Sequence, residues 1–401
     1  MYCTREIAPQ VHWIGGSDRR LALFENMFPL PDGVSYDAYV IVDEKTAALD
    51  TIDSALSNQY FENLDHVLGG RHLDYLIVNH MEPDHCAAIG ELVLRHPDVK
   101  LVGNKKTFQF IRQFYDFDLA DRCIEVKEGD TLDLGRHKLT FVMAPMVHWP
   151  EAMMTYDATE KILFSADAFG TFGAFHGSIF ADEVDFETRY ADEARRYYTN
   201  IVGKYGPQVQ AVLKKAGTVD IQMFCPLHGP IWRKDLGWIL DKYSHWSSYT
   251  PEDKGVVIAY ASMYGNTQNA SEVLANMLAE RGVQNIRVYD VSKTHASYII
   301  SDAFRFSNLV FAAPTYNNGA YFGMENLLHD MVRLNLQNRK VSFIGNGSWA
   351  PVSDKCMEKV VLEMKNTEIV GTPVVLRSSL KEAQLSDLAA LADAIAASVK
   401  A

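Results

Sequence analysis

The stretch at residues 79–85, Asn-His-Met-Glu-Pro-Asp-His, constrains this chain more than any other. It follows the apolar run at residues 73–78, which is typical of a buried strand in a parallel or mixed sheet. Pro83 carries no N–H donor and disfavours helix for the residue before it, so we expect an extended turn that spreads its side chains. Four groups on this turn are suited to bind metal, enough for two ions: His80, Glu82, Asp84 and His85.

Three further candidate ligands stand in the same context, each just after a strand-like apolar run. They are His148 after residues 139–143, Asp167 after residues 161–165, and His228 after residues 221–226. Such residues also occur in acidic proteins as solvated loop groups. Four strand ends that all carry metal-binding groups favour a metal site over solvated loop groups, because ligands of open sheets collect at the carboxyl ends of strands. We therefore expect the four segments to converge.

The ligand types indicate a redox metal pair. One arrangement places His80, Glu82 and His148 on a first metal and Asp84, His85 and His228 on a second, with Asp167 bridging them. A nearly all-imidazole pair of sites would suit zinc hydrolysis. Carboxylate-rich sites suit iron or manganese better, because hard anionic oxygen stabilises the higher oxidation states that redox chemistry needs.

A second pattern begins after the polar, turn-rich seam at residues 247–255. An apolar strand at 256–261 leads into Ser-Met-Tyr-Gly-Asn-Thr at 262–267, and a helix-like segment follows at 268–280. Backbone N–H groups at a helix start bind anions, and hydroxyl groups add donors without charge, so this loop is suited to a phosphate. It lacks the Gly-Lys-Ser/Thr ending of a nucleoside triphosphate site and the Gly-x-Gly-x-x-Gly of a dinucleotide fold.

Two later loops also fall at strand ends. Residues 309–313 form a predicted strand followed by the loop 314–319, and residues 341–344 form another, followed by 345–350. Both loops stand at strand carboxyl ends, where ligands bind in a doubly wound parallel sheet. An amphipathic helix is predicted at residues 380–400, closing the sheet.

Length and charge narrow the class of protein. With 401 residues the chain should form two domains, which we predict at 1–250 and 251–401. A net charge of −13 argues against nucleic acid, and no apolar run or basic leader suggests a membrane or export, so we predict a cytoplasmic protein. The five cysteines form no Cys-x-x-Cys pair, so a rubredoxin-type iron site must lie on another protein.

These residues resemble the flavodiiron proteins. The metallo-β-lactamase superfamily carries His-x-His-x-Asp-His in the metal loop, whereas this chain has His-x-Glu-x-Asp-His, the exchange at Glu82 that marks iron in the family. The other ligand motifs also match: His148-Trp-Pro, Ser165-Ala-Asp-Ala-Phe-Gly and Pro226-Leu-His-Gly. The resemblance extends over essentially all 401 residues, because the loop at 262–267 is similar to the flavodoxin phosphate loop.

The resemblance implies an α/β protein with two domains. The first would be a metallo-β-lactamase-like αββα sandwich with two iron ions, and the second a flavodoxin-like parallel sheet with FMN. The seven metal ligands would be those proposed above, with no catalytic residue beyond them, although His85 turns away from the metal in some relatives. FMN contacts are expected at Ser262, Met263, Tyr264, Gly265, Asn266 and Thr267, at Pro314, Thr315, Tyr316, Asn317, Asn318 and Gly319, and at Gly347, Ser348, Trp349 and Ala350.

The resemblance also implies an activity. FMN would pass electrons to the diiron site, which would reduce O₂ to water, NO to N₂O, or both. Rubredoxin or a reduced deazaflavin would be the donor, and the protein would form a head-to-tail homodimer or a dimer of dimers. A zinc metallo-hydrolase fused to a flavodoxin electron carrier is the alternative, but it would be expected to carry imidazole at position 82.

Overall fold

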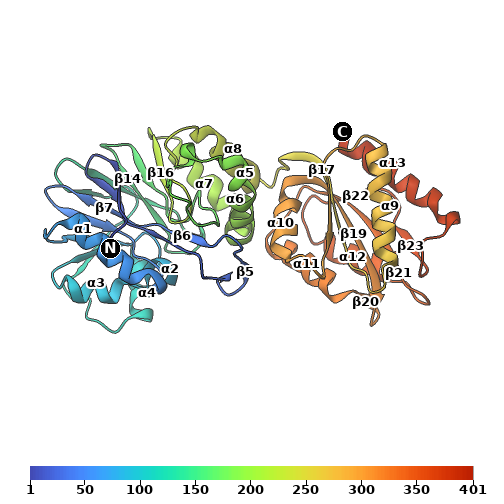
Figure 1. Cartoon of the computed structure of the whole chain (residues 1–401), viewed down its shortest axis with the longest axis horizontal. Helices are drawn as coiled ribbons and strands as arrows, with labels where there is room; N and C mark the ends of the chain where they lie inside the picture. The colour runs from blue at the N-terminus through green and yellow to red at the C-terminus, as the bar shows by residue number, and fades with distance from the viewer. Residues whose placement is uncertain (401) are drawn as a thin grey trace. The chain divides into compact units, whose positions relative to one another are not determined.

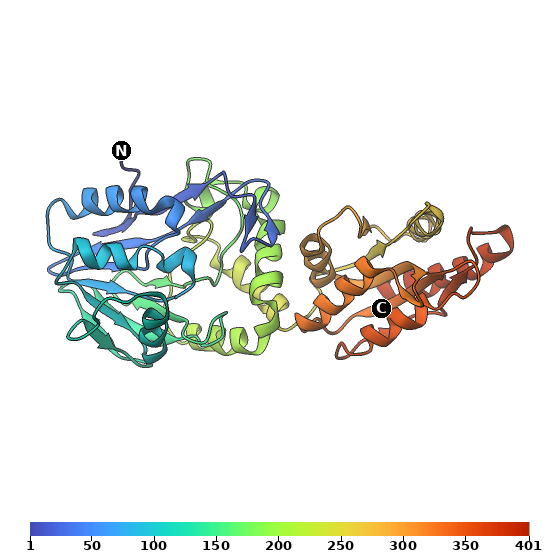
Figure 2. The same ribbon diagram turned by 90° about the horizontal axis from the view of Figure 1, so that it is seen from below.

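The computed structural model describes residues 1–400, and the chain forms two compact units (Figures 1 and 2). The first comprises Met1–Tyr198 and Pro207–Asp241, and the second takes in Thr199–Gly206 and resumes at Lys242. Residue 250, the predicted domain boundary, lies in the loop between helix α8 (Leu236–Ser247) and strand β17 (Asp253–Tyr260).

Two β-sheets face each other in the first unit. The larger has seven strands in the order β1 (Arg5–Ala8), β2 (Val11–Trp13), β7 (Tyr39–Val42), β8 (Thr46–Leu49), β9 (Tyr75–Ile77), β10 (Lys100–Gly103) and β11 (Cys123–Glu125). The smaller has five in the order β12 (Thr131–Asp133), β13 (Lys138–Met143), β14 (Met153–Asp157), β15 (Ile162–Phe164) and β16 (Met223–Cys225). Ile77 and Val102 of the larger sheet share one buried core with Phe141 and Phe164 of the smaller.

Helices cover the outer faces of these sheets, which confirms the predicted αββα order (Figure 1). Beside the larger sheet lie α1 (Ser57–Leu68), α3 (Ile89–Arg95) and α4 (Lys105–Phe114). Beside the smaller sheet lie α5 (Phe186–Arg189), α6 (Ala191–Tyr197), α7 (Gly206–Ala216) and α8.

Strand register brings two of the expected ligands to the same edge. β15 and β16 are parallel neighbours, and Phe164 pairs with Cys225 at their carboxyl ends. Asp167 and His228 each follow that pair by three positions (167 − 164 and 228 − 225). They therefore emerge side by side, as parallel pairing requires.

One part of the metal loop differs from the expected extended turn. Glu82 is extended, with φ −65° and ψ 141°, but the chain then enters a one-turn helix, α2 (Pro83–Cys86). Proline suits the first turn of a helix because the N–H it lacks has no intrahelical partner there. The turn places Asp84 and His85 on consecutive helical positions.

The second unit is built on a mostly parallel sheet in the order β18 (Ile286–Asp290), β17, β19 (Phe306–Tyr316), β21 (Lys340–Asn346) and β22 (Glu368–Ile369). The short strands β20 (Gly319–Ala320) and β23 (Val374–Leu376) extend it at β19 and β21. Alternate residues of its central strands face opposite cores. Val257 and Phe311 belong to one core, and Ile258 and Val310 to the other.

Helices flank this sheet on its two faces (Figure 1). The first core includes side chains of α10 (Ala296–Arg305), α11 (Phe322–Arg333) and α12 (Ser353–Val361). The second includes α9 (Asn266–Glu280) and α13 (Leu385–Lys400), the latter within the predicted C-terminal amphipathic segment. This confirms the predicted doubly wound fold.

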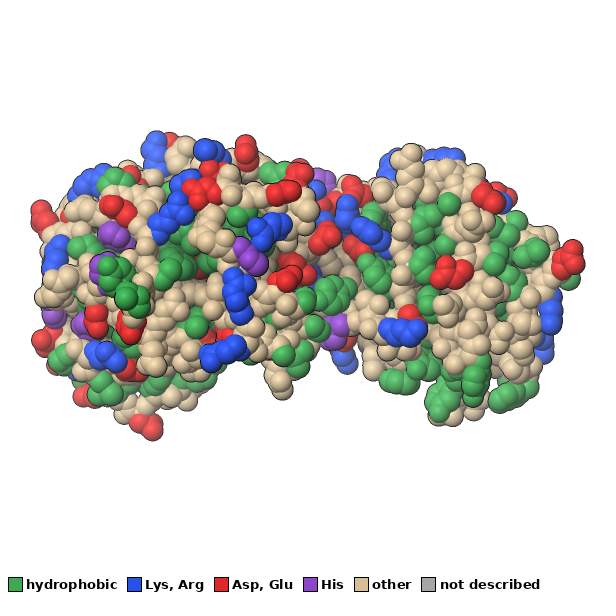
Figure 3. All heavy atoms as spheres, viewed as in Figure 1, with side chains coloured by type: hydrophobic (Ala, Val, Ile, Leu, Met, Phe, Trp, Pro, Cys, Tyr) green, Lys and Arg blue, Asp and Glu red, His purple; other side chains and the backbone are tan. Residues whose placement is uncertain are grey.

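Acidic and basic side chains are interspersed on the face of the first unit drawn in Figure 3. At the lower end of the second unit, near β20, hydrophobic side chains gather at the surface. Across residues 1–400, no helix has both the length and the apolar character needed to span a membrane. The cytoplasmic location stays a prediction.

Candidate metal centre and cofactor groove

The first ligand cluster joins three strand-end loops of the first unit. His80 Nε2 lies 3.2 Å from Glu82 Oε2 and 3.1 Å from Asp167 Oδ2. His148 Nε2 lies 3.0 Å and 3.1 Å from the same two oxygens. The ligand atoms of these four buried residues all fall within 4.8 Å of one another, which is close enough for one metal ion to bind them all.

The second cluster lies beside the first. His85 Nε2 and His228 Nε2 are 3.0 Å apart, and each is 3.3 Å from Asp84 Oδ2. The ligand atoms of these three buried residues also lie within 4.8 Å of one another. His85 therefore points into the centre.

Asp167 belongs to both clusters. Its Oδ2 faces His80 and His148, as described, whereas its Oδ1 lies 3.3 Å from His85 Nε2 and 3.8 Å from His228 Nε2. A carboxylate whose two oxygens face two separate ligand sets has the geometry of a bridge between two metal ions.

The donor atoms fit two cations. Both carboxylate oxygens of Asp84 and of Asp167, together with His148 Nε2, are buried and form no hydrogen bond within the described chain. Leaving such atoms unpaired is costly, so buried charges are normally paired or coordinate metals. Seven converging imidazole and carboxylate groups with these unpaired atoms at their centre suit metal ions of the iron class.

The electrostatics of the centre favour positive charge. Burial alone would lower the pKa of His148, but the carboxylates of Asp167 and Glu82 raise it to about 9. Burial likewise opposes charge on His228, yet Asp84 and Asp167 raise its pKa to about 9. Burial would raise the pKa of Asp167, but the surrounding imidazoles, led by His80, hold it well below the usual range.

A second layer of residues fixes the ligands. Glu151 Oε1 accepts from His80 Nδ1 and from the N–H of Met81, each at 2.9 Å. Asp50 accepts the N–H groups of Asn79 at 2.7 Å and His80 at 3.1 Å. These bonds fix the loop that carries the first cluster. Sequence reasoning missed Glu151, and its position directly after His148-Trp-Pro was the available signal.

The second cluster is fixed mainly by backbone groups. His228 Nδ1 donates to the carbonyl oxygen of Ser35 at 2.8 Å. Thr51 donates to the carbonyl oxygen of His85 through both its N–H, at 2.9 Å, and its Oγ1, at 2.8 Å. Gly229 has φ 77°, and a Cβ there would lie 2.2 Å from Thr171 Cγ2, so only glycine fits after His228.

A cavity of about 350 Å³ opens onto the metal centre. It lies between the hairpin of β4 (Leu23–Phe24) and β5 (Phe28–Pro29) and the ligand loop, and both Glu82 and Asp84 line it. Phe24, Glu25 and Tyr36 line its other side. Burial and the nearby Glu82 raise the pKa of Glu25 to about 8. The centre thus has one face open to a small molecule.

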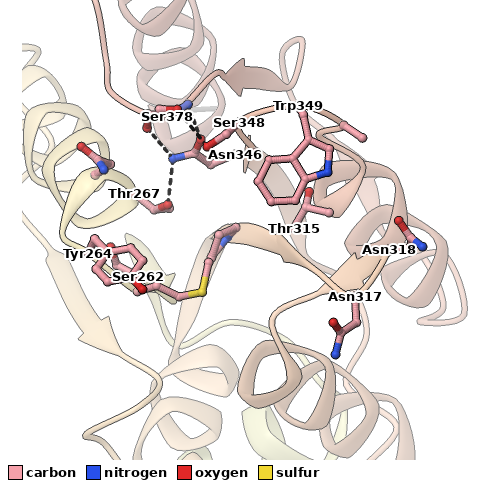
Figure 4. Close-up of a pocket in the computed structure, with 15 residues that line it drawn as sticks. Ser262, Tyr264, Thr267, Thr315, Asn317, Asn318, Asn346, Ser348, Trp349 and Ser378 are labelled. Carbon is pink, nitrogen blue, oxygen red and sulfur yellow. Dashed lines mark hydrogen bonds between the residues drawn. The ribbon is translucent and has the colours of Figure 1, made fainter.

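The second unit carries a groove at the carboxyl ends of β17, β19 and β21 (Figure 4). Thirteen of the sixteen residues predicted to contact FMN line it: Ser262, Met263, Tyr264, Asn266, Thr267, Pro314, Thr315, Asn317, Asn318, Gly347, Ser348, Trp349 and Ala350. The other three, Gly265, Tyr316 and Gly319, do not line it. Gly265 is the N-cap of α9 with φ 87°, a left-handed conformation that glycine adopts readily.

Two residues that line the groove were not predicted from the sequence. Asn346 ends β21, and Ser378 follows β23 two positions on (378 − 376). Asn346 Nδ2 donates to Thr267 Oγ1 at 3.2 Å and to the carbonyl oxygen of Ser378 at 2.8 Å. A polar residue directly before Gly347 was a readable signal, whereas Ser378 had only its place after a short apolar run.

The groove fits a phosphate attached to a flat aromatic ring. Gly265 provides no side-chain cap for α9, so the first N–H groups of that helix are available to an anion. Tyr264 is 91 % exposed and Trp349 87 % exposed, and they lie on opposite sides of the cavity in Figure 4. Large exposed aromatic rings are suited to cover a cofactor ring.

Family models match both units. A model described as ODP family beta lactamase matches residues 34–229, and a flavodoxin model matches residues 258–360. The first covers all seven proposed metal-ligand positions, and the second covers the loops at 262–267 and 314–319.

Similar proteins share both units in one chain. The anaerobic nitric oxide reductase flavorubredoxin of Aeromonas hydrophila is 31% identical over 345 residues, which is 84% of this chain and 69% of that protein. The rubredoxin oxygen:oxidoreductase of Desulfovibrio gigas is 28% identical, with a TM-score of 0.93 over 99% of both chains. The flavodiiron protein of Giardia intestinalis, at 24% identity, shares the fold with a TM-score of 0.89 over 100% of this chain and 98% of that one.

Proposed function

Because the chain belongs to the flavodiiron protein family, we propose that it is an oxidoreductase that reduces O₂ to water, NO to N₂O, or both, with electrons passed through FMN. The relatives support both substrates, since one is named a nitric oxide reductase and another an oxygen oxidoreductase. Four electrons and four protons convert O₂ to two water molecules. Two electrons and two protons convert two NO molecules to N₂O and one water molecule.

The observation that carries the proposal is the division of the Asp167 carboxylate between two ligand clusters. His80, Glu82 and His148 would hold one iron, and Asp84, His85 and His228 the other, with Asp167 bridging. Iron bound there would supply the redox chemistry. The residues around it hold the ligands in place, and the 350 Å³ cavity beside Glu82 and Asp84 leaves room for a diatomic molecule.

FMN would bind in the groove of the second unit. The N-terminal end of α9, with Ser262 and Thr267, would receive the phosphate, and the exposed rings of Tyr264 and Trp349 would flank the isoalloxazine. The flavin would take up two electrons and release them singly.

The electron donor and the oligomer are further parts of the proposal. The name of the Desulfovibrio relative supports a rubredoxin as donor, and a reduced deazaflavin is the second possibility. The 401 residues contain no Cys-x-x-Cys pair that could form a rubredoxin iron site. We also propose a head-to-tail homodimer or a dimer of dimers in which one subunit's flavin serves its partner's iron.

Gas consumption tests the activity. Protein verified to contain FMN and two iron ions per chain is reduced anaerobically and exposed in parallel to O₂ and to NO. Each fully reduced chain, with two electrons on FMN and one on each iron, is expected to consume one O₂ or four NO molecules. Loaded, reduced protein that consumes neither would contradict the proposal.

Metal analysis and mass measurement test the remaining parts. The alternative function, a zinc hydrolase, would give two zinc ions and no iron in protein isolated from its natural source. Glu82 favours iron, because it replaces one imidazole by a carboxylate.

Sedimentation analysis should show a dimer or tetramer, and an interface variant that is monomeric should keep both cofactors but lose turnover. A fully active monomer would exclude transfer between subunits.

A further inference from the structure

Glu151 contacts the first ligand cluster in a way that has no counterpart in the second. Its Oε1 lies 2.9 Å from His80 Nδ1, and both side chains are fully buried, with 0% and 1% exposure. Because a carboxylate oxygen accepts, His80 donates its Nδ1 proton outward and presents Nε2 to the metal centre. The N–H of Met81 donates to the same oxygen at 2.9 Å, which fixes the carboxylate against the loop.

The imidazoles of the second cluster have neutral partners or none. His228 Nδ1 donates to a backbone carbonyl, that of Ser35, at 2.8 Å. His85 Nδ1 is buried and forms no hydrogen bond within residues 1–400. Each cluster has one carboxylate ligand of its own, Glu82 or Asp84, and the two share Asp167. Glu151 therefore places a carboxylate behind an imidazole of the first cluster, whereas His85 and His228 of the second cluster have no carboxylate bonded to Nδ1.

The other acidic groups nearby are divided between the two clusters, so the difference between the clusters depends on Glu151. Asp50 accepts the backbone N–H of His80 at 3.1 Å but also attracts His85, and Asp37 attracts His228. A carboxylate that accepts the outer N–H of a metal-bound imidazole makes that imidazole a stronger donor. Negative charge in a buried site also stabilises the more highly charged state of a nearby ion. Both effects favour ferric iron at the position that His80 binds.

We propose that Glu151 is a positioning residue that makes the two iron sites electronically unequal. Asp84, His85 and His228 would hold the iron that is reduced first. His80, Glu82 and His148, with Glu151 behind His80, would hold the iron that stays ferric until a second electron is supplied. This inference rests on the proposed function, since it requires two iron ions and an electron supply, either the flavin or an added reductant such as dithionite.

A redox titration of protein that contains FMN and iron tests the proposed role of Glu151. Wild-type protein with FMN and two ⁵⁷Fe ions per chain is titrated with dithionite and followed by Mössbauer and EPR spectroscopy. Two separate one-electron steps are expected for the iron pair. Glu151→Gln keeps an oxygen acceptor of the same size but removes the negative charge. The lower of the two iron potentials should rise by about 59 mV or more, which corresponds to a tenfold change in the ferric preference, while the higher one moves less.

A matched variant controls for loss of a buried carboxylate. His137 and Asp157 form an equally buried pair in the first unit, with Nδ1 and Oδ2 2.8 Å apart and 0% exposure of both side chains. Asp157→Asn should lower thermal stability but leave both iron potentials unchanged. Glu151→Ala, which also removes the acceptor, should weaken iron binding about 10–100-fold.

The outcomes separate the two proposals. If Glu151→Gln with two bound iron ions keeps both wild-type potentials, or raises only the higher one, the inference is wrong. The same holds if Asp157→Asn shifts the lower potential equally. If wild-type protein binds no iron pair, or binds it and consumes neither gas, the proposed function fails before the Glu151 variants are compared.

Discussion

Asn346, the last residue of β21, is joined to Thr267 in the first turn of α9, because Asn346 Nδ2 donates to Thr267 Oγ1 at 3.2 Å (Figure 4). The same amide group holds a third segment. It donates to the carbonyl oxygen of Ser378 at 2.8 Å, and its Oδ1 accepts the N–H of Ser378 at 3.1 Å. One buried side chain thus joins the end of β21 to the start of α9 and to the segment after β23.

Asn346→Ala should weaken FMN binding about tenfold. The change removes three hydrogen bonds and leaves the buried Thr267 hydroxyl without this partner, and an unpaired buried group typically costs about 1–3 kcal/mol. Fluorescence titration of flavin-free protein with FMN would measure the dissociation constant. Asn276→Ala, an exposed change on the same helix as Thr267, should leave that constant unchanged. Equal constants for Asn346→Ala and wild type would refute the role of Asn346.

Asp167→Ala should abolish the metal pair. The change removes the carboxylate whose two oxygens face the two ligand clusters, and it leaves four imidazoles to share two carboxylates. We expect iron content to fall from two to below one ion per chain, with gas consumption lost and FMN content unchanged. Elemental analysis and flavin absorbance would measure these. A variant that keeps two iron ions would show that Asp167 does not bridge them.

Gly229→Ala should destabilise the first unit by about 2 kcal/mol or more. A left-handed conformation costs about 1–2 kcal/mol for a residue with a Cβ, and the clash with Thr171 Cγ2 adds to this. For a unit of this size, melting should fall by roughly 4–8 °C. Measuring metal-free protein separates this effect from weaker metal binding.

Gly237→Ala is the control for that change. Nothing lies within 4 Å of a Cβ built at Gly237, and its φ is not positive, so its melting temperature should not fall. Combining Gly229→Ala with Thr171→Ser should recover part of the loss, because serine lacks Cγ2. No recovery would mean that backbone strain, rather than the clash, accounts for the effect.

Metal removal should lower the melting temperature of the first unit and leave that of the second unchanged. The carboxylate oxygens of Asp84 and Asp167 have no hydrogen bond that could replace a cation within the described residues. A ligand present at one hundred times its dissociation constant stabilises the folded state by about 2.7 kcal/mol. Calorimetry before and after chelation would resolve the two transitions. A first unit that melts at the same temperature without metal would count against two buried cations.

The sequence allowed the ligand positions to be predicted because strand ends have simple geometry. An apolar run followed by His or Asp identifies a side chain at a sheet edge, and parallel pairing of β15 with β16 then places Asp167 beside His228. The same reasoning located the loops at 262–267 and 314–319 at one edge of the second sheet. Family resemblance, rather than spacing, provided the identity of the metal and of the flavin.

What could not be predicted depends on contacts between distant segments. Glu151 reaches His80 across 71 positions, and Asn346 reaches Thr267 across 79. No local pattern encodes which nitrogen of an imidazole faces outward, or whether its partner is a carboxylate or a carbonyl. The helical turn at Pro83 was missed because proline was taken to end regular structure, whereas here it begins a helix.

The flavin groove is lined, within residues 1–400, entirely by uncharged side chains. Hydroxyl groups, amides and helix N–H groups there would hold the phosphate without a lysine or arginine. Dissolved ions screen attraction between full charges far more than they weaken short hydrogen bonds in a partly enclosed site. We therefore expect FMN affinity to depend less on ionic strength than it would in a groove that binds the phosphate through lysine or arginine.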